Sequence, residues 1–598
     1  MKNRGLTIAE KFALGWPLVI IVTVLALVFF FLTTFEADYL WMAQELNLFL
    51  CTPEFFAEQF SAPGSLLTWM GTLFTTFFFY PYFGVGVLIL MWVFLMYCIG
   101  GTFNIPLGWS CLLLVPISAI LITIVGLGYW IYYMSMSGHL FASTIGTTLS
   151  VCSVWLFRKI TASHYFRIAY MALIIPLLYH LIGWYGLMAS LLMAIISWRV
   201  QDMKSTYRIQ ATCIAMIFTI SYPLTYYYTL NTQNSLHEIY MVGIPSFYQG
   251  EYHFAYLIPY YFIVFTLCIM AATYNQNRKS SSTMLPVRVC CQLVLVVVMT
   301  IIVSCLWFKD YNFHKELSMQ RCLERFDWEG ILKESELQED EPTRAVVMMR
   351  NLALFRLGKQ GDEMYHYRSG NKAYKTSLPN PLARMLASVL YFHYGQLNYC
   401  MRWAIEEAME TGLRMTNLKY LIRSALANGE ECLADKYIDI MDKTLWYKDW
   451  TLKYKDFLFS REAMMTDAEF APSIRLSKSE DMLGNDYGRV ELFIMHQFAF
   501  HDNEDTLFQE QAVLSAMWTK KPQLFWPRFY SYISGHPGIH IPIHFQEAAL
   551  LFATLNGIDT QNIPFDTVVL ENFESYVKQR KNTTYYYEYF MTPDHNQY

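Results

Sequence analysis

The sequence predicts an all-α protein: a polytopic helical membrane domain with about nine crossings, followed by a soluble helical-repeat domain. Three observations support this fold class. No Asp, Glu, Lys or Arg occurs between Gln59 and Phe157, and such a run must cross a bilayer repeatedly because one helical crossing takes roughly 20 apolar residues. Hydrophobic residues make up 55% of the 598 residues and charged residues only 16%. After Phe308 the composition becomes ordinary, and glycines recur every 34 residues.

Charged residues up to Phe308 separate into two groups. The basic residues are Lys2, Arg4, Lys11, Arg158, Lys159, Arg167, Arg199, Lys204, Arg208, Arg278, Lys279 and Arg288. The acidic residues are Glu10, Glu36, Asp38, Glu45, Glu54, Glu58, Asp202, Glu238 and Glu251. Only Glu10 and Asp202 share predicted loops with the bases. Because cytoplasmic loops carry the excess of Lys and Arg, we expect a multi-pass protein of the cytoplasmic (inner) membrane with a cytoplasmic N-terminus. An odd number of crossings puts the C-terminal half in the periplasm or another extracytoplasmic space.

Nine apolar segments account for the crossings within residues 1–308. The first, from about Ala13 to Phe35, is too long for the core of a typical signal peptide, and no small-residue cleavage site follows it. The others are predicted near Tyr82–Ile99, Trp109–Tyr129, Leu140–Phe157, Ile168–Trp184, Leu187–Trp198, Ile209–Tyr227, Phe254–Ala272 and Val289–Phe308. After the first crossing, Tyr39–Leu50 is amphipathic at helical spacing, which predicts a helix lying along the outer membrane interface.

The second half is predicted to contain a repeat region, residues 309–460, and a C-terminal helical region, residues 461–598. In the repeat region Gly361, Gly395 and Gly429 are 34 residues apart, each between two helix-like segments. That period is the length of a tetratricopeptide helix pair, and the region resembles the tetratricopeptide family. Each glycine is expected to make the tight turn between two antiparallel helices.

Composition excludes two classes of function. After Phe308 the chain has 32 Lys and Arg against 40 Asp and Glu. It therefore lacks the strongly basic surface that nucleic-acid binding requires, and no nucleic-acid partner is expected. The cysteines include no C-x-x-C pair, so neither a zinc ribbon nor a thioredoxin-like site is indicated.

The pair Glu36-x-Asp38 is the main candidate for chemistry, because it directly follows the first crossing at the outer edge of the membrane. Two carboxylates there could bind a divalent cation such as Mg²⁺ or Mn²⁺ through hard oxygen ligands. One of them could instead act as a general base on an acceptor hydroxyl. The alternative is that acids are simply permitted in outer loops and have no catalytic role.

Other polar residues gather on the same predicted outer face. These candidate substrate-binding residues are His139, His180, His237, Glu238, Glu251 and His253. A polar residue near membrane depth tends to face a protein interior or cavity, and His180, near the outer end of a crossing, is the clearest case. The alternatives are a hydrogen-bonded packing histidine for His180, and the capping of loop ends for His237, Glu238, Glu251 and His253.

In its layout the first half resembles the GT-C superfamily of membrane glycosyltransferases, which includes the oligosaccharyltransferases and protein O-mannosyltransferases. Glu36 and Asp38 match the acidic position of that family, and Tyr39–Trp69 matches its long outer loop. The resemblance implies transfer of a sugar or glycan from a polyprenyl-phosphate-linked donor to a protein or glycan acceptor. It also implies a catalytic or metal-binding role for Asp38. A second acidic motif of the family is missing from Trp130–His139.

Two further features bear on this resemblance. The predicted outer face of the membrane half carries no base, although enzymes that handle phosphate usually neutralise it with Arg, Lys or a metal. A metal held by carboxylates would answer this, or a basic group from the second half, such as Lys309, Lys315 or Arg321. The segment Phe60–Gly84 also resembles that of an uncharacterised bacterial multi-pass membrane family with helical C-terminal domains.

Two other functions are open to such a chain. The first is a non-enzymatic scaffold, in which the crossings anchor a helical-repeat module that binds envelope proteins, as repeat solenoids bind partners along a concave face. The second is a transporter. It is disfavoured because no Asp, Glu, Lys or Arg lies in the middle of a predicted crossing, and such residues mark ion pathways.

Overall fold

The computed structural model describes residues 8–160, 163–201, 203–230, 235–248, 254–275, 285–337, 340–370, 372–477, 484–558 and 564–592. Over these residues the protein is helical with no β-strand, apart from one isolated bridge between Met134 and Phe247. The all-α prediction is therefore confirmed. The chain forms two compact units: an apolar unit, residues 1–309 with 443–446, and a polar unit, residues 310–442 with 447–598.

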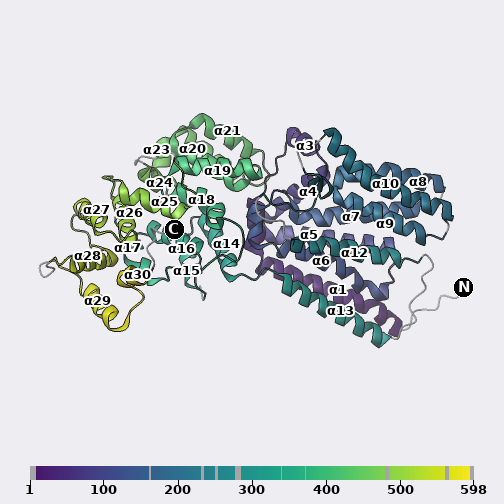
Figure 1. The fold of residues 1–598 in the computed structure, drawn as a ribbon, viewed down its shortest axis with the longest axis horizontal. Helices are drawn as coiled ribbons and strands as arrows, with labels where there is room; N and C mark the ends of the chain where they lie inside the picture. The colour runs from purple at the N-terminus through teal and green to yellow at the C-terminus, as the bar shows by residue number, and fades with distance from the viewer. Residues whose placement is uncertain are drawn as a thin grey trace. The chain divides into compact units, whose positions relative to one another are not determined.

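The apolar unit is a bundle of long helices that lie side by side (Figure 1). The long helices are α1 (Ile8–Thr34), α5 (Pro81–Phe103), α6 (Leu114–Val125) with η2 (Leu107–Leu113), α7 (His139–Lys159), α8 (His164–Ile182), α9 (Trp184–Arg199), α10 (Ser205–Leu230), α12 (Ile258–Ala272) and α13 (Leu285–Leu306). Each coincides with one predicted crossing to within a turn or two. The shorter elements are α2 (Ala37–Glu45), α3 (Pro53–Gln59), α4 (Ser65–Thr75), η1 (Thr76–Phe79), η3 (Gly128–Tyr133), α11 (Leu236–Tyr240) and η4 (Phe254–Leu257).

Eight of the described helices are long and apolar enough to cross a membrane. The ninth, α9, has 16 residues, which span about 24 Å at 1.5 Å per residue. The rings of His164 and Tyr207 lie 4.8 Å apart, so α8 and α10 start at the same end of the bundle. Helix α9, which connects them along the chain, therefore runs antiparallel to both. In the last turn of α9 the Trp198 indole donates to Thr212 Oγ1 in α10, at 2.9 Å. We infer that α9 is the remaining crossing.

The direction of the helices places the basic residues of the described crossings at one end of the bundle, here called the basic end. Three hydrogen bonds join this end: Arg158 Nη1 to Thr102 O (2.6 Å), Asn104 Nδ2 to Asn275 O (3.1 Å) and Gln292 Nε2 to Gly108 O (2.6 Å). The first two join the end of α5 to the ends of α7 and α12, and the third joins α13 to the start of η2. The opposite end, here called the acidic end, holds Glu36 and the short helices that follow α1.

The short helices at the acidic end are packed into the bundle. In α2 every residue from Tyr39 to Glu45 is buried, so the predicted interfacial helix is wrong. An interfacial helix would expose one face, whereas α2 is covered on all sides. Helix α4 is held by Gly64 N, which donates to His180 O at 2.8 Å. It also packs against α7 where Gly71 meets Gly138, so closely that a Cβ on Gly138 would lie 2.3 Å from the Gly71 carbonyl carbon.

The polar unit consists of short helices that pack as successive hairpins. They are α14 (Tyr311–Glu324), α15 (Trp328–Glu336), α16 (Arg344–Arg356), α17 (Gln360–Glu363), η5 (Met364–His366), α18 (Pro381–His393), α19 (Leu397–Thr411), α20 (Met415–Asn428), α21 (Glu431–Asp442), α22 (Lys448–Phe459), α23 (Arg461–Thr466), α24 (Phe470–Leu476), α25 (Val490–Phe500), α26 (Thr506–Trp518), α27 (Pro522–Gly535), α28 (Ile543–Leu555), α29 (Thr567–Gln579) and α30 (Tyr585–Met591).

Two of the three repeat glycines make the expected turns. Gly395 (φ +75°) joins α18 to α19, and Gly429 (φ +78°) joins α20 to α21. Both adopt the left-handed conformation that only glycine enters freely. Gly361 instead lies inside α17, and the turn after α16 is made by Gly358 (φ +67°). The 34-residue period therefore describes two helix pairs of this unit and not the third.

Replacing Gly138 with Ala should destabilise the apolar unit. The added Cβ would overlap the α4 backbone, and Gly138 has φ +69°, so overpacking alone should cost about 1–3 kcal/mol. The matched control is Gly86→Ala, because nothing lies within 4 Å of a Cβ there. Thermal unfolding of the purified chain measures both variants, and equal unfolding temperatures would contradict the close packing of α4 on α7.

Candidate functional site

Glu36 is a buried carboxyl at the point where α1 ends. Its side chain is 2% exposed, and the residue precedes the first turn of α2. The Trp307 indole donates to Glu36 Oε1 at 2.5 Å. Burial raises the pKa of Glu36 to about 8, and the Trp307 hydrogen bond lowers it only in part. At neutral pH the folded protein therefore holds this carboxyl mostly protonated, because burial disfavours the charged form of an acid.

Trp307 joins the last long helix to the first. It follows α13 directly, and its ring meets the ring of Phe31 in α1 edge to face, with the centroids 5.0 Å apart. The next residue, Phe308, donates its backbone N–H to Val125 O at the end of α6, at 3.1 Å. The ends of α1, α6 and α13 therefore meet at Glu36.

An apolar groove runs between the same three helices, along the α13 residues that precede Trp307 in the chain. It has a volume of about 380 Å³, and its walls include Phe31 of α1, Ser118 of α6, and residues from Leu295 of α13 to Trp307, which directly follows that helix. Twelve helical steps along α13 correspond to about 18 Å, which is more than half of the roughly 30 Å hydrocarbon core of a bilayer. The groove therefore has the length and lining of a site for an apolar chain.

A basic residue lies at the acidic end of this groove. Lys309 Nζ is 5.6 Å from the centroid of the Trp307 ring and donates to Ser304 Oγ at 2.9 Å. Ser304 and Trp307 both line the groove. The Lys309 side chain is exposed, so a ligand can reach its ammonium group. Lys309 is one of the bases that the sequence offered for neutralising a phosphate.

Asp38 lies in the first turn of α2, two residues beyond Glu36, and is partly exposed. The two carboxyl groups thus occupy different surroundings, one enclosed and the other open to solvent. A difference of this kind can separate the roles of two neighbouring acids, because the surroundings of each carboxyl group decide what it can do.

The other predicted substrate-binding residues belong to other helices than Glu36 or lie outside the described residues. His139 begins α7 and is partly buried. His180 ends α8, and its carbonyl oxygen accepts from Gly64 N and Ser65 Oγ. His237 and Glu238 belong to α11, which packs on α10 near α8. Figure 1 shows α8 and α10 at one edge of the bundle and α1 and α13 at the other. Glu251 and His253 lie outside the described residues.

Glu238 has a local structural role. It forms a capping box with Ser235, in which Ser235 N donates to Glu238 Oε2 at 2.9 Å and Glu238 N donates to Ser235 Oγ at 3.3 Å. The capping role that the sequence offered as an alternative is thus the one the structure describes. Among the described residues, no three His, Cys, Asp or Glu side chains form a cluster that could hold a metal ion.

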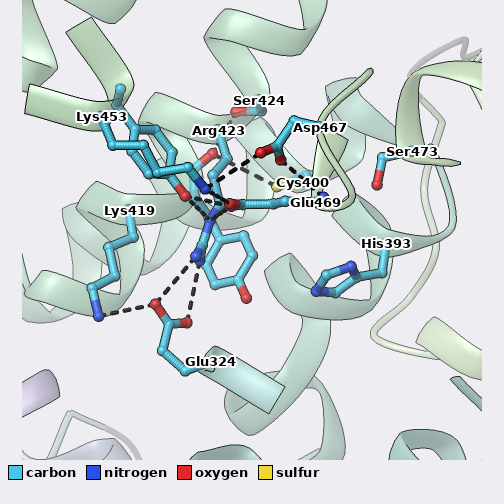
Figure 2. A network of polar contacts seen from close by, with 12 residues as sticks. Glu324, His393, Cys400, Lys419, Arg423, Ser424, Lys453, Asp467, Glu469 and Ser473 are labelled. Carbon is cyan, nitrogen blue, oxygen red and sulfur yellow. Dashed lines mark hydrogen bonds and ion pairs between the residues drawn. The ribbon is translucent and has the colours of Figure 1, made fainter. Parts of the chain in front are cut away.

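The polar unit contains a buried charged network around Arg423 of α20, shown in Figure 2. The guanidinium pairs with Glu469 (Nε to Oε1, 2.7 Å) and with both oxygens of Glu324 (3.2 Å each). Lys419 Nζ also lies 3.1 Å from Glu324 Oε1, and Lys453 Nζ lies 3.2 Å from Glu469 Oε2. Opposite charges surround one another throughout, so this network holds α14, α20 and α22 together, and we assign it a structural role.

Sequence reasoning missed Trp307, whose indole donates to the Glu36 side chain. Its position just after the last crossing was visible, but the sequence does not say which helices are neighbours in a bundle. An odd number of crossings does place the end of the last helix at the same membrane face as the end of the first. That parity was the one signal that could have suggested the contact.

These features define a class: an all-α protein in which a bundle of membrane-crossing length, with a buried acid at one end, is joined to a unit of helical hairpins. A family model described as "Family of unknown function (DUF6057)" matches residues 13–592, and the chain belongs to that family. The match extends over both units. No curated protein and no solved structure matches the chain.

Replacing Glu36 with Gln should change how stability depends on pH. The folded pKa of about 8 lies above the ordinary value of 4.5, so the folded state holds the proton more tightly, and wild-type stability should fall as pH rises from about 4.5 to 8. The neutral Gln cannot titrate, and that fall should disappear. Thermal unfolding between pH 5 and 8 measures the difference, with the exposed Glu54→Gln as control. A pH profile identical to wild type would contradict a buried, protonated Glu36.

Replacing Glu324 with Gln should weaken the polar unit at neutral pH. The neighbouring charges of Arg423 and Lys419 outweigh burial and lower the Glu324 pKa to about 2. This stabilisation is present above about pH 4.5 and is lost as pH falls toward 2. The variant should cost about 2 kcal/mol at pH 7, and the difference from wild type should shrink on acidification. Glu574→Gln, in the exposed Glu574–Lys578 pair, is the control, and an equal effect there would contradict the network.

Proposed function

We propose that this protein is a membrane glycosyltransferase or oligosaccharyltransferase that uses a polyprenyl-phosphate-linked sugar donor at the outer face of the cytoplasmic membrane. The observation that carries the proposal is the apolar groove between α1, α6 and α13, which ends at Trp307, Ser304 and Lys309 beside a buried acid. A lipid-linked donor has the same order of parts: a long apolar chain, then a phosphate, then the sugar.

The charges at the end of the groove support this assignment. Lys309 would face the donor phosphate, and the exposed ammonium group would offset the negative charge that develops on the leaving phosphate. Asp38 would act as the general base that removes the proton from the acceptor hydroxyl as its oxygen attacks the sugar. Glu36, protonated and bonded to Trp307, would position the α1–α13 junction. An Mg²⁺ or Mn²⁺ ion at Asp38 is not needed for these roles.

The charge pattern supports the proposed membrane position. The basic end would face the cytoplasm, as the excess of Lys and Arg in cytoplasmic loops requires. With nine crossings the acidic end and the polar unit would lie on the extracytoplasmic side, where a protein or glycan acceptor would be met.

Replacing Asp38 with Asn should abolish transfer and cause the lipid-linked donor to accumulate. Loss of a general base lowers a rate roughly 100-fold or more. A second experiment fills the groove with a larger side chain. Val296 lines the groove, so Val296→Trp should also cause the donor to accumulate. Val297→Trp, one residue along and 57% exposed, should not. Mass spectrometry of lipid-linked saccharides, extracted from cells that carry only the variant chain, measures the donor. Glu54→Gln, an exposed acid of the same outer segment, is the control.

Wild-type levels of donor in the Asp38→Asn cells, at equal protein abundance, would contradict the proposal. The hairpins of the polar unit favour one alternative, a membrane-anchored scaffold without chemistry for envelope protein assembly. In that case Asp38→Asn and Val296→Trp would both behave as wild type, and deletion of the polar unit alone would remove the function.

A further inference from the structure

The polar unit has a hollow where α19 meets the loop Gly484–Gly488. Its volume is about 410 Å³, and Arg402, Trp403 and Glu406 of α19 line it together with that loop. This size falls within the range of about 300–1,000 Å³ that small-ligand sites occupy. The hollow lies outside the site proposed for sugar transfer and outside the Arg423 network.

A buried carboxylate fixes the loop against α19. Asp486 Oδ2 accepts from Tyr391 Oη at 2.6 Å and from Trp403 Nε1 at 2.7 Å, while Oδ1 accepts from Arg402 Nη2 at 2.9 Å and from Gly488 N at 3.2 Å. Four donors therefore satisfy both oxygens. Arg402 Nη1 also donates to Gly484 O at 2.6 Å, which ties the start of the loop to the same helix.

The fixed loop presents one aromatic ring to solvent. Tyr487 is 77% exposed, and its φ is +52°. A non-glycine residue rarely adopts this left-handed conformation, because its Cβ crowds the backbone. Residues held in such conformations gather at ligand sites, where the surrounding structure overcomes the strain. Tyr487 adopts this strained backbone conformation although its ring stays mostly exposed to solvent.

The polar groups at the rim indicate which ligand fits. Arg402 lies 2.9 Å from Asp486 and 3.4 Å from Glu406, so its positive charge is already balanced and offers little to an anion. Glu406 and Asn485 are exposed and provide carboxylate and amide groups for hydroxyls. With one positive and two negative groups the hollow disfavours an anion, and its exposed ring, carboxylate and amide suit a ligand with one flat apolar face and several hydroxyl groups.

We propose that the hollow binds a ring of a neutral saccharide. The apolar face of the sugar ring stacks on Tyr487, and its hydroxyls bond to Glu406 and Asn485. This glycan-binding site is separate from the proposed transfer chemistry and does not rest on it. Asp38→Asn should therefore bind saccharide as well as wild type does, so failure of one proposal leaves the other standing.

The test uses the full chain in lipid nanodiscs, which avoids detergents with sugar head groups. Its probe is an array of neutral and acidic oligosaccharides of two to six units. Wild type should bind neutral members of the array. Tyr487→Gly should bind at least ten-fold more weakly without a lower unfolding temperature, because glycine adopts φ +52° freely. Tyr487→Phe should retain binding, since it keeps the ring. Tyr530→Ala, at another exposed tyrosine, should leave binding unchanged.

Three outcomes would overturn the proposal. The first is no binding to any neutral oligosaccharide above background. The second is equal binding by wild type and Tyr487→Gly. The third is binding of acidic oligosaccharides alone, or displacement of the saccharide by peptides of random sequence, which would assign the hollow to a different ligand class.

Discussion

The apolar unit depends on one constraint: a charged side chain cannot be buried alone in an apolar bundle without a large cost. Helix ends with bases must therefore lie outside the apolar middle of the unit, and in the described crossings they lie at the same end. The hydrogen bonds of Arg158, Asn104 and Gln292 across neighbouring helices show how closely these ends meet. The alternating direction of the helices then leaves the opposite end for the acids. Glu36 is buried there, and burial raises its pKa far enough to keep the carboxyl mostly protonated at neutral pH.

The junction at Glu36 follows from this arrangement. The first and the last long helix end at the same level, so that Trp307 reaches Glu36 and Phe31. This contact closes the groove between α1, α6 and α13 at one end, and Lys309 follows immediately. An enclosed acid, an open acid and an accessible base thus gather where an apolar chain would end, and this is why we favour lipid-linked chemistry over a purely structural role.

The fold was largely predictable because apolar segments of crossing length and charge segregation are properties of the sequence itself. The burial of α2 was not, since its amphipathic pattern does not say whether Tyr39–Glu45 meets lipid or other helices. Glu36 and Asp38 were found through their place after the first crossing, but Trp307 required knowledge of which helices are neighbours. Tyr487 gave no pattern at all, because its exposure depends on the bonds of Asp486 to Tyr391 and Trp403.

The parity of the crossings tests the account most directly, because the site, the side of the membrane and the acceptor all depend on it. One epitope tag would be attached before Met1 and another after Tyr598, and antibody access would be measured in spheroplasts, whose outer membrane has been opened, and in spheroplasts lysed with detergent. Nine crossings predict that the C-terminal tag is reached in intact spheroplasts, and the N-terminal tag only after lysis. Both tags on the same side would mean an even number of crossings, and would contradict the account.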